Sequence, residues 1–296
     1  MAKHNYSGEI ALLTTALIWG SGFIGVDYCL DVGFPPGMIN MLRFLLGALT
    51  LAIILNKKIL KITPAVIKTG CIAGVFYFAG FMFQAVGMQT IEVSSNALLT
   101  ATNLLMVPFI TRICFKNKIP FRVYVAVFAC FFGIAVLNWS DGGIHFAIGD
   151  ILTLICAVCF ACHISYLGHA GGDKDTVQLT FMQLLVVGIL SAVYFLIFET
   201  DQVAITNQSM GCLSIVYLAL MPTALCMFLQ TFGQRRTETA KSAILLSLES
   251  LFGAGFSVIL GLEPLTINLF LGGGIIFLSV LWLEWKNNKA EGVAQL

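Results

Sequence analysis

Six side chains that could contact a small molecule lie at similar positions within separate apolar segments of the sequence. They are Trp19, Tyr77, Asn103, Phe160, Thr223 and Glu249. If each segment is a membrane-crossing helix, a rise of about 1.5 Å per residue places all of them within a few Å of the bilayer centre. A carboxylate, an amide, a hydroxyl and aromatic faces suit a zwitterionic or cationic, partly apolar solute, because aromatic faces also attract ammonium groups. Ordinary helix packing is the competing explanation for the aromatic residues.

Glu249 is the residue most expected to take part in binding. A carboxylate at this depth is costly, so a glutamate retained there ordinarily faces a cavity, a cation or a hydrogen-bond donor. We expect Glu249 to accept a substrate ammonium or a proton, while Asn103 bonds the opposite end of the solute. A structural hydrogen bond between helices is the alternative.

Two other ionisable residues lie deep in apolar segments. Arg43 lies about six residues, or roughly 9 Å, below the outer edge of its segment, where a charge usually has a partner. Asp27 in the preceding segment is the best-placed partner, which predicts a structural charge pair; direct substrate binding by Arg43 is the alternative. His163 is a candidate for proton coupling because imidazole titrates near neutral pH. We favour a neutral His163 that is hydrogen-bonded to a backbone or hydroxyl group.

Ten apolar segments position these residues, each near the length that crosses about 30 Å of hydrocarbon. They cover residues 8–30, 37–55, 66–88, 92–115, 122–137, 149–168, 176–198, 211–233, 241–260 and 266–285. With an inside N-terminus, all of the 16 Lys and Arg residues except Arg43 fall on the inner side. The positive-inside rule therefore predicts an all-α integral membrane protein with ten transmembrane helices and both termini cytoplasmic. An apolar content of 58%, only 10% charged residues and a mean hydropathy of +0.93 agree.

Two motifs are misleading when read without their context. Residues 156–162 hold a C-x-x-C-x-x-C run, but cysteines three apart on a helix form a packing stripe, and we predict no metal site. The G-x-G-x-x-G string at residues 20–25 lies within an apolar segment, whereas a dinucleotide fold needs a strand before it and a helix after it. The sequence lacks an H-E-x-x-H motif, and His163 has no obvious acidic neighbour, so we expect no enzyme and no cofactor. The basic residues are loop anchors, which predicts no nucleic-acid partner.

The sequence also matches itself. A shift of 146 residues aligns the string at Gln84, QAVGMQTIEVSSNA, with the string at Gln230, QTFGQRRTETAKSA. A shift of 141 residues aligns GEI at Gly8 with GDI at Gly149 and brings Trp19 opposite Phe160. These matches predict two five-helix repeats, residues 1–140 and residues 141–296, the second ending in a short cytoplasmic tail. Because five is odd, the second repeat must be inverted, a recurrent plan for secondary transporters.

Several segments, in this order, resemble the EamA branch of the drug/metabolite transporter superfamily. They are WGSGF at Trp19, LRFLLGALTLAI at Leu42, NALLTATNLLMVPF at Asn96, SAILLSLESLFGAGFSVILGLEPL at Ser242 and the glycine-rich tenth segment. The resemblance runs from about Gly8 to Trp285. It implies an inverted repeat of five plus five helices, a central cavity lined mainly by the first, third, fourth, sixth, eighth and ninth spans, and export of amino acids or other small metabolites. The family usually has proline after the ninth-span glutamate, whereas Ser250 stands here, which leaves open whether that span is broken. Pro108 and Pro222 could still bend the fourth and eighth spans.

The combined expectation is a secondary transporter in the cell (inner or plasma) membrane. We expect an exporter of amino acids or similar small amphiphilic metabolites that works by alternating access, the direction resting on the resemblance alone. An importer or a drug efflux protein of the same fold is the alternative. From other classes, a non-transporting scaffold or an intramembrane enzyme remains open. A phosphorylated solute would need several intramembrane cations, and only Arg43 is available. The expected partners are a small-molecule substrate and the lipid bilayer, with homo-oligomerisation left open.

Overall fold

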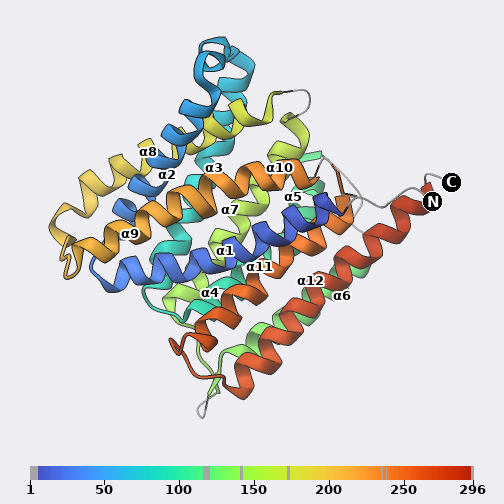
Figure 1. The fold of residues 1–296 in the computed structure, drawn as a ribbon. Helices are drawn as coiled ribbons and strands as arrows, with labels where there is room; N and C mark the ends of the chain where they lie inside the picture. Colours follow the sequence, from blue (N-terminus) through green and yellow to red (C-terminus); the bar gives the residue numbers. More distant parts are fainter. Residues whose placement is uncertain are drawn as a thin grey trace.

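The computed structural model is a bundle of helices with one short β-hairpin (Figure 1). It describes residues 6–115, 121–140, 143–171, 174–234, 236–237 and 239–294. The longer helices are α1 Ser7–Asp31, α2 Pro36–Leu55, α3 Pro64–Met88, α4 Val93–Thr100, α5 Asn103–Phe115, α6 Phe121–Leu137, α7 Ile148–Ala170, α8 Thr176–Phe198, α9 Gln208–Leu218, α10 Cys226–Gln234, α11 Thr239–Ile259 and α12 Ile267–Ala294. Short helical turns are η1 Asn56–Lys61, η2 Thr200–Gln202 and the π-helical η3 Ala219–Leu225.

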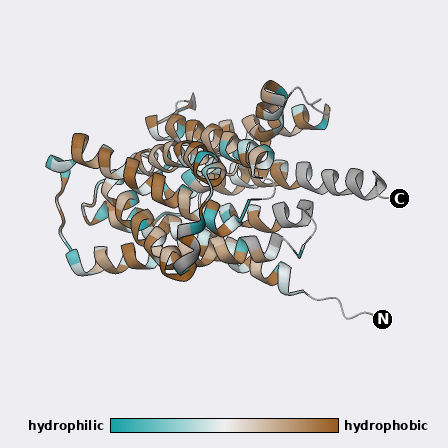
Figure 2. Ribbon diagram, turned by 90° about the horizontal axis from the view of Figure 1, so that it is seen from above, coloured by the Kyte–Doolittle hydropathy of each residue, from teal (hydrophilic) through white to brown (hydrophobic). Residues whose placement is uncertain are grey.

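The helices have the composition of membrane spans. Within the described residues, 7 helices are long and apolar enough to cross a bilayer, counting α4 with α5 and α9 with η3 and α10. Three shorter apolar helices cover residues Phe121–Leu137, Leu245–Ile259 and Ile267–Trp282. Hydrophobic residues run along the helices in Figure 2, and many large apolar side chains are exposed on their surfaces. A predominantly helical, multi-pass membrane fold is therefore confirmed, while the ten crossings, the inverted repeat and the cytoplasmic termini stay predictions.

The loop between α6 and α7 departs from the expected all-helical structure. Strands β1 Trp139–Ser140 and β2 Gly143–Ile144 pair in antiparallel fashion. Gly143 has a φ of +120°, which only glycine adopts without strain. A hairpin this short has no periodicity that a sequence pattern could reveal.

The fourth span is interrupted, although not at its proline. Helix α4 ends at Thr100 and α5 begins at Asn103, which is five residues before Pro108. Across the break, the Thr102 hydroxyl donates to the Leu99 carbonyl oxygen at 2.7 Å, and backbone bonds span three residues in place of four. A threonine side chain that competes for backbone groups in this way disfavours a regular helix. Pro108 itself lies inside α5.

The eighth span is distorted at its proline, as expected. Pro222 lies in η3, where the Thr223 hydroxyl donates to the Leu218 carbonyl oxygen at 2.8 Å.

The ninth span is not broken at the position where Ser250 stands in place of the usual proline: α11 is continuous through Glu249 and Ser250. Serine keeps the backbone N–H that proline lacks, so the helix is not interrupted.

Helices distant in sequence pack side by side (Figure 1). Helix α2 packs on α8, α6 on α12, and α4 on α11. Helix α1 lies against α10 and α11, while α3 lies against α7 and α8. The N-terminal end of α1 and the C-terminal end of α12 are at the same side of the bundle.

Glycines permit two of the closest helix contacts. A Cβ atom at Gly87 in α3 would lie 3.0 Å from the carbonyl oxygen of Gly149 in α7. A Cβ atom at Gly233 in α10 would lie 2.9 Å from the carbonyl oxygen of Gly8 in α1. Small residues let helix backbones approach in this way within a membrane.

We therefore expect Gly87→Ala and Gly233→Ala each to lower the stability of the detergent-purified protein by on the order of 1–3 kcal/mol, because backbone must move away from the added methyl group. Thermal unfolding would measure the loss. Gly255→Ala is the matched control, since nothing lies within 4 Å of its Cβ position. Equal melting temperatures for all three variants would contradict the close-packing role.

Candidate functional site

A buried cluster of charged, polar and aromatic side chains lies among α2, α3, α7, α8 and η3. At its centre Arg43, only 6% exposed, donates from Nε to Oγ1 of Thr223 at 2.9 Å. The guanidinium carbon lies 5.0 Å from the ring centroids of both Phe44 and Phe81. A hydroxyl acceptor and two aromatic faces therefore stabilise the buried cation.

The predicted pair between Arg43 and Asp27 is wrong in this structure. In the part of the chain that the structure describes, no carboxylate is within ion-pair distance of Arg43, whose hydrogen bond goes to Thr223. Asp27 instead lies near the C-terminal end of α1, where it interacts electrostatically with Asp31 and Glu92. Counting residues estimates depth along a helix, but it does not say which face a side chain occupies. Arg43 faces η3 and not the end of α1.

A second part of the cluster is built around His163 in α7. Its ring stacks on Tyr77 of α3, with centroids 4.3 Å apart and planes 9° apart. Nε2 of His163 lies 2.6 Å from Oε1 of Gln183 in α8, and the Gln183 amide nitrogen donates to the Leu179 carbonyl oxygen. Oε1 of Gln183 is therefore the acceptor and Nε2–H of His163 the donor, an arrangement that a neutral imidazole supplies. The partner is a side-chain amide, whereas we expected a backbone or hydroxyl group.

Aromatic rings close the space between these polar groups. The Phe160 ring lies 5.7 Å from Tyr77 and 5.1 Å from Phe81, both in edge-on geometry. Tyr77 also meets Phe81 at 4.7 Å. The predicted residues Tyr77 and Phe160 are thus brought together, and Phe81 joins them.

Glu249 in α11 is electrostatically part of the same site. Its negative charge interacts with Arg43, and it also acts on Tyr77, Cys156 and Cys226 in α3, α7 and α10. The side chain is partly buried, and its carboxylate has no hydrogen bond to any described residue. A carboxylate without such a bond remains able to accept one.

The other two predicted residues lie beside the cluster. Trp19 in α1 donates from Nε1 to the carbonyl oxygen of Pro222 at 2.7 Å, which ties its indole to the turn that carries Thr223. Asn103 begins α5, directly after the break in the fourth span, and is partly buried. No hydrogen bond or ring contact of the described residues links Asn103 to Glu249.

The sequence analysis does not identify two members of the cluster, Gln183 and Phe81. For a third, Arg43, it favours a structural pair with Asp27 over direct substrate binding. Gln183 carried a usable signal, because it is a polar residue in the middle of an otherwise apolar segment and is now only 2% exposed.

Comparisons with known proteins agree with this architecture. The profile described as the EamA-like transporter family matches residues 6–139 and again residues 147–285. An uncharacterized transporter of Archaeoglobus fulgidus is 31% identical over 273 residues, which cover 92% of this chain and 84% of the relative. Uncharacterized transporter YdfC of Bacillus subtilis (strain 168) is 21% identical over 281 residues, which cover 93% of this chain and 90% of the relative. One protein crystal structure superposes with a TM-score of 0.64 at 16% identity, over 93% of this chain and 96% of that chain, and it supports the fold alone.

Apolar helices that could cross a bilayer, together with relatives that carry transporter names, define a multi-pass membrane transporter. The family profile covers nearly the whole sequence in two matches, and the chain belongs to the EamA-like transporter family.

The hydrogen bond between Arg43 and Thr223 leads to a test of how the cluster is held. Thr223→Val removes the acceptor while keeping the shape, so the buried guanidinium loses its bond, and we expect a stability loss of about 1–3 kcal/mol. Thr223→Ser, which keeps the hydroxyl, should unfold at nearly the wild-type temperature. Differential scanning fluorimetry of both variants measures this; equal losses would show that the methyl group matters and the hydroxyl does not.

Proposed function

We propose that the protein is a secondary transporter that exports amino acids or similar small amphiphilic metabolites by alternating access. The observation that carries this proposal is that two opposite charges interact near the centre of the bundle without a direct ion pair among the described residues. Arg43 and Glu249 interact there beside an aromatic cluster. Such a site complements a solute that carries both an acidic and a basic group and an apolar side chain.

Packing supports a ten-span fold of two inverted repeats, residues 1–140 and 141–296. If each helix is replaced by its counterpart in the other half, three contacts are unchanged: α2 with α8, α6 with α12, and α4 with α11. The contact of α3 with α7 maps onto that of α10 with α1. The glycine contacts follow the same exchange, since Gly87 on Gly149 corresponds to Gly233 on Gly8. Inverted repeats of this kind suit a site at the midplane that opens to either side.

The positive charges support cytoplasmic termini in the cell membrane. Links with basic residues, such as η1, the α7–α8 loop and the C-terminal end of α12, gather at one end of the bundle (Figure 1). The links that lack them lie at the opposite end. Lys3, Lys116, Lys118 and Arg235, which also contribute to the predicted asymmetry, lie outside the described residues. The positive-inside rule then orients the end with basic residues toward the cytoplasm.

Each residue of the site has a role in this proposal. Glu249 accepts a substrate ammonium or a proton. The positive charge of Arg43 attracts the substrate carboxylate, while its guanidinium stays hydrogen-bonded to Thr223. Tyr77 and Phe160 contact the apolar part of the solute. Trp19 lines the space from α1, and Asn103 bonds the far end of the solute from the break in the fourth span.

A two-stage experiment tests the function. Thermal stabilisation of purified protein against a panel of amino acids and metabolites identifies a ligand, because a ligand that binds only the folded state raises its stability. Counterflow of that ligand in liposomes then distinguishes a transporter from a scaffold or an enzyme, neither of which exchanges solute across a membrane. The same liposomes, with the ligand on either side, separate an exporter from an importer or a broad drug efflux protein.

Glu249→Gln should fold normally and lose most ligand binding and flux, by at least about tenfold, since shape is kept while the charge is removed. Glu92→Gln is the matched control, because Glu92 is an exposed glutamate at the outer end of the bundle, away from the cluster. Counterflow at the wild-type rate in Glu249→Gln, over a range of pH, would rule out the binding role.

His163→Gln tests proton coupling. Glutamine can donate to Gln183 as the imidazole does, so we expect the variant to keep most transport and its pH dependence. Initial rates of flux at several pH values, at equal expression, provide the measurement. If pH-dependent flux disappears in this variant, His163 and not Glu249 carries the coupled proton.

A further inference from the structure

A second buried carboxylate, far from the central site, joins helices of the two halves. Glu263 follows α11 in the loop to α12 and is only 8% exposed. Its Oε1 accepts from the backbone N–H of Ser94 at 3.0 Å, and its Oε2 accepts from the Ser94 hydroxyl at 2.6 Å. The hydroxyl of Ser257 in α11 donates to Oε1 as well. Both carboxylate oxygens are therefore used.

These bonds connect the start of one helix to the end of another. Ser94 lies in the first turn of α4, in the first half of the chain, whereas Ser257 and Glu263 belong to the second half. A carboxylate at the N-terminal turn of a helix accepts otherwise unpaired backbone N–H groups and is favoured by the helix dipole. Glu263 thus holds α4 to the corner between α11 and α12.

Another carboxylate accepts a hydrogen bond from the first turn of a helix in the same way. Oε2 of Glu199, at the end of α8, accepts from the backbone N–H of Gly37 in the first turn of α2 at 2.7 Å. Burial raises the pKa of Glu199, while hydrogen bonds from Gly37 and Met38 oppose that rise. This contact again joins the second half of the chain to the first.

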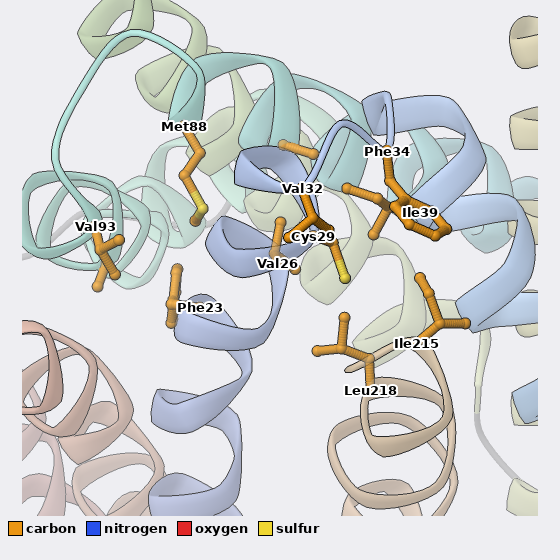
Figure 3. Packing of buried hydrophobic residues seen from close by; sticks show 12 residues of the cluster. Phe23, Val26, Cys29, Val32, Phe34, Ile39, Met88, Val93, Ile215 and Leu218 are labelled. Atoms are coloured by element: carbon orange, nitrogen blue, oxygen red, sulfur yellow. The ribbon is translucent and has the colours of Figure 1, made fainter. Parts of the chain in front are cut away.

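Beneath these contacts lies a hydrophobic plug formed by several helices (Figure 3). It contains Phe23 and Cys29 of α1, Ile39 of α2, Val93 of α4 and Leu218 of α9 among its members. Val93 directly precedes Ser94, so the bond to Glu263 holds one wall of the plug in place. Cys29 is fully buried within it.

The opposite end of the bundle does not repeat this arrangement in sequence. Shifting by 146 residues pairs Glu263 with Asn117 and Ser94 with Ala240. An amide replaces the carboxylate, and an alanine replaces the hydroxyl donor. The latch is therefore encoded at one end of an otherwise repeated plan.

We propose that Glu263 is a latch of the outer gate, which holds α4 against the α11–α12 corner and keeps the hydrophobic plug closed. The proposal rests on alternating access as proposed above, and it makes Glu263 a positioning residue that does not touch the solute. Breaking the latch shifts the population toward a state in which the centre of the protein is open to the outside.

Cysteine labelling from the outer side tests the latch without any substrate. A membrane-impermeant maleimide is added to intact cells, and labelled peptides are quantified by mass spectrometry. Cys212, exposed on α9 at the same end, reports folded and correctly oriented protein, while buried Cys29 reports opening of the plug. We expect Glu263→Gln to raise the rate of Cys29 labelling on the order of tenfold relative to Cys212, because an amide has one acceptor oxygen for three donors.

Ser94→Ala provides a second route to the same state, since it removes one donor and leaves Glu263 in place. It should raise Cys29 labelling by a smaller factor, and it decides the matter if Glu263→Gln does not reach the membrane. Glu92→Gln is the control: it removes the same charge two residues from Ser94 but no bond of the latch, so Cys29 labelling should not rise. Unchanged Cys29 labelling in Ser94→Ala and Glu263→Gln, or an equal rise in Glu92→Gln, overturns the proposal. Neither result bears on whether Glu249 binds a solute.

Discussion

The need to accommodate one buried guanidinium shapes the centre of this protein. A cation in the hydrocarbon region cannot rely on water, so its neighbours must supply acceptors and polarisable surface. Arg43 donates a hydrogen bond to the Thr223 hydroxyl, and its guanidinium lies over the rings of Phe44 and Phe81. Thr223 is available because Pro222 relaxes the eighth span into a π-helical turn, whose widened backbone accepts the threonine's own hydrogen bond. The proline, the threonine and the arginine therefore act as one unit.

That unit also explains the position of Glu249. Opposite charges inside a membrane lower each other's cost, yet no ion pair within 4 Å joins Arg43 and Glu249 among the described residues. A direct pair would satisfy both groups and, on the proposed function, would leave neither of them available to bind a solute. Holding the charges apart, with Arg43 bonded to Thr223, keeps the carboxylate available while retaining the electrostatic benefit. Tyr77, stacked on His163, forms a rigid wall beside them.

Sequence patterns predict those features of the site that depend only on position along each helix. Apolar length indicated the spans, and residue counting gave depths at which Tyr77, Phe160, Thr223 and Glu249 do share a region. Rotation about each helix axis is not contained in such counts, which is why Arg43 was paired with Asp27. Periodicity also fails to predict two local features. One is the break in the fourth span, where the Thr102 side chain competes for backbone hydrogen bonds, and the other is the short hairpin at Trp139. The continuous α11, by contrast, follows directly from a serine where a proline would remove a backbone N–H.

The glycine contacts and the carboxylate contacts have different consequences for motion. Gly87 on Gly149 and Gly233 on Gly8 bring backbones together through dispersion forces that are similar at both ends of the bundle. Helices packed in this way can pivot with little net change in contact energy, provided that one end closes as the other opens. Hydrogen bonds to Glu263 are directional and are lost outright when α4 moves away. A nearly symmetric frame with a latch at one end has a preferred state. If the proposed function and latch hold, solute at the central site must therefore supply the free energy that offsets the latch before the end that carries Glu263 opens.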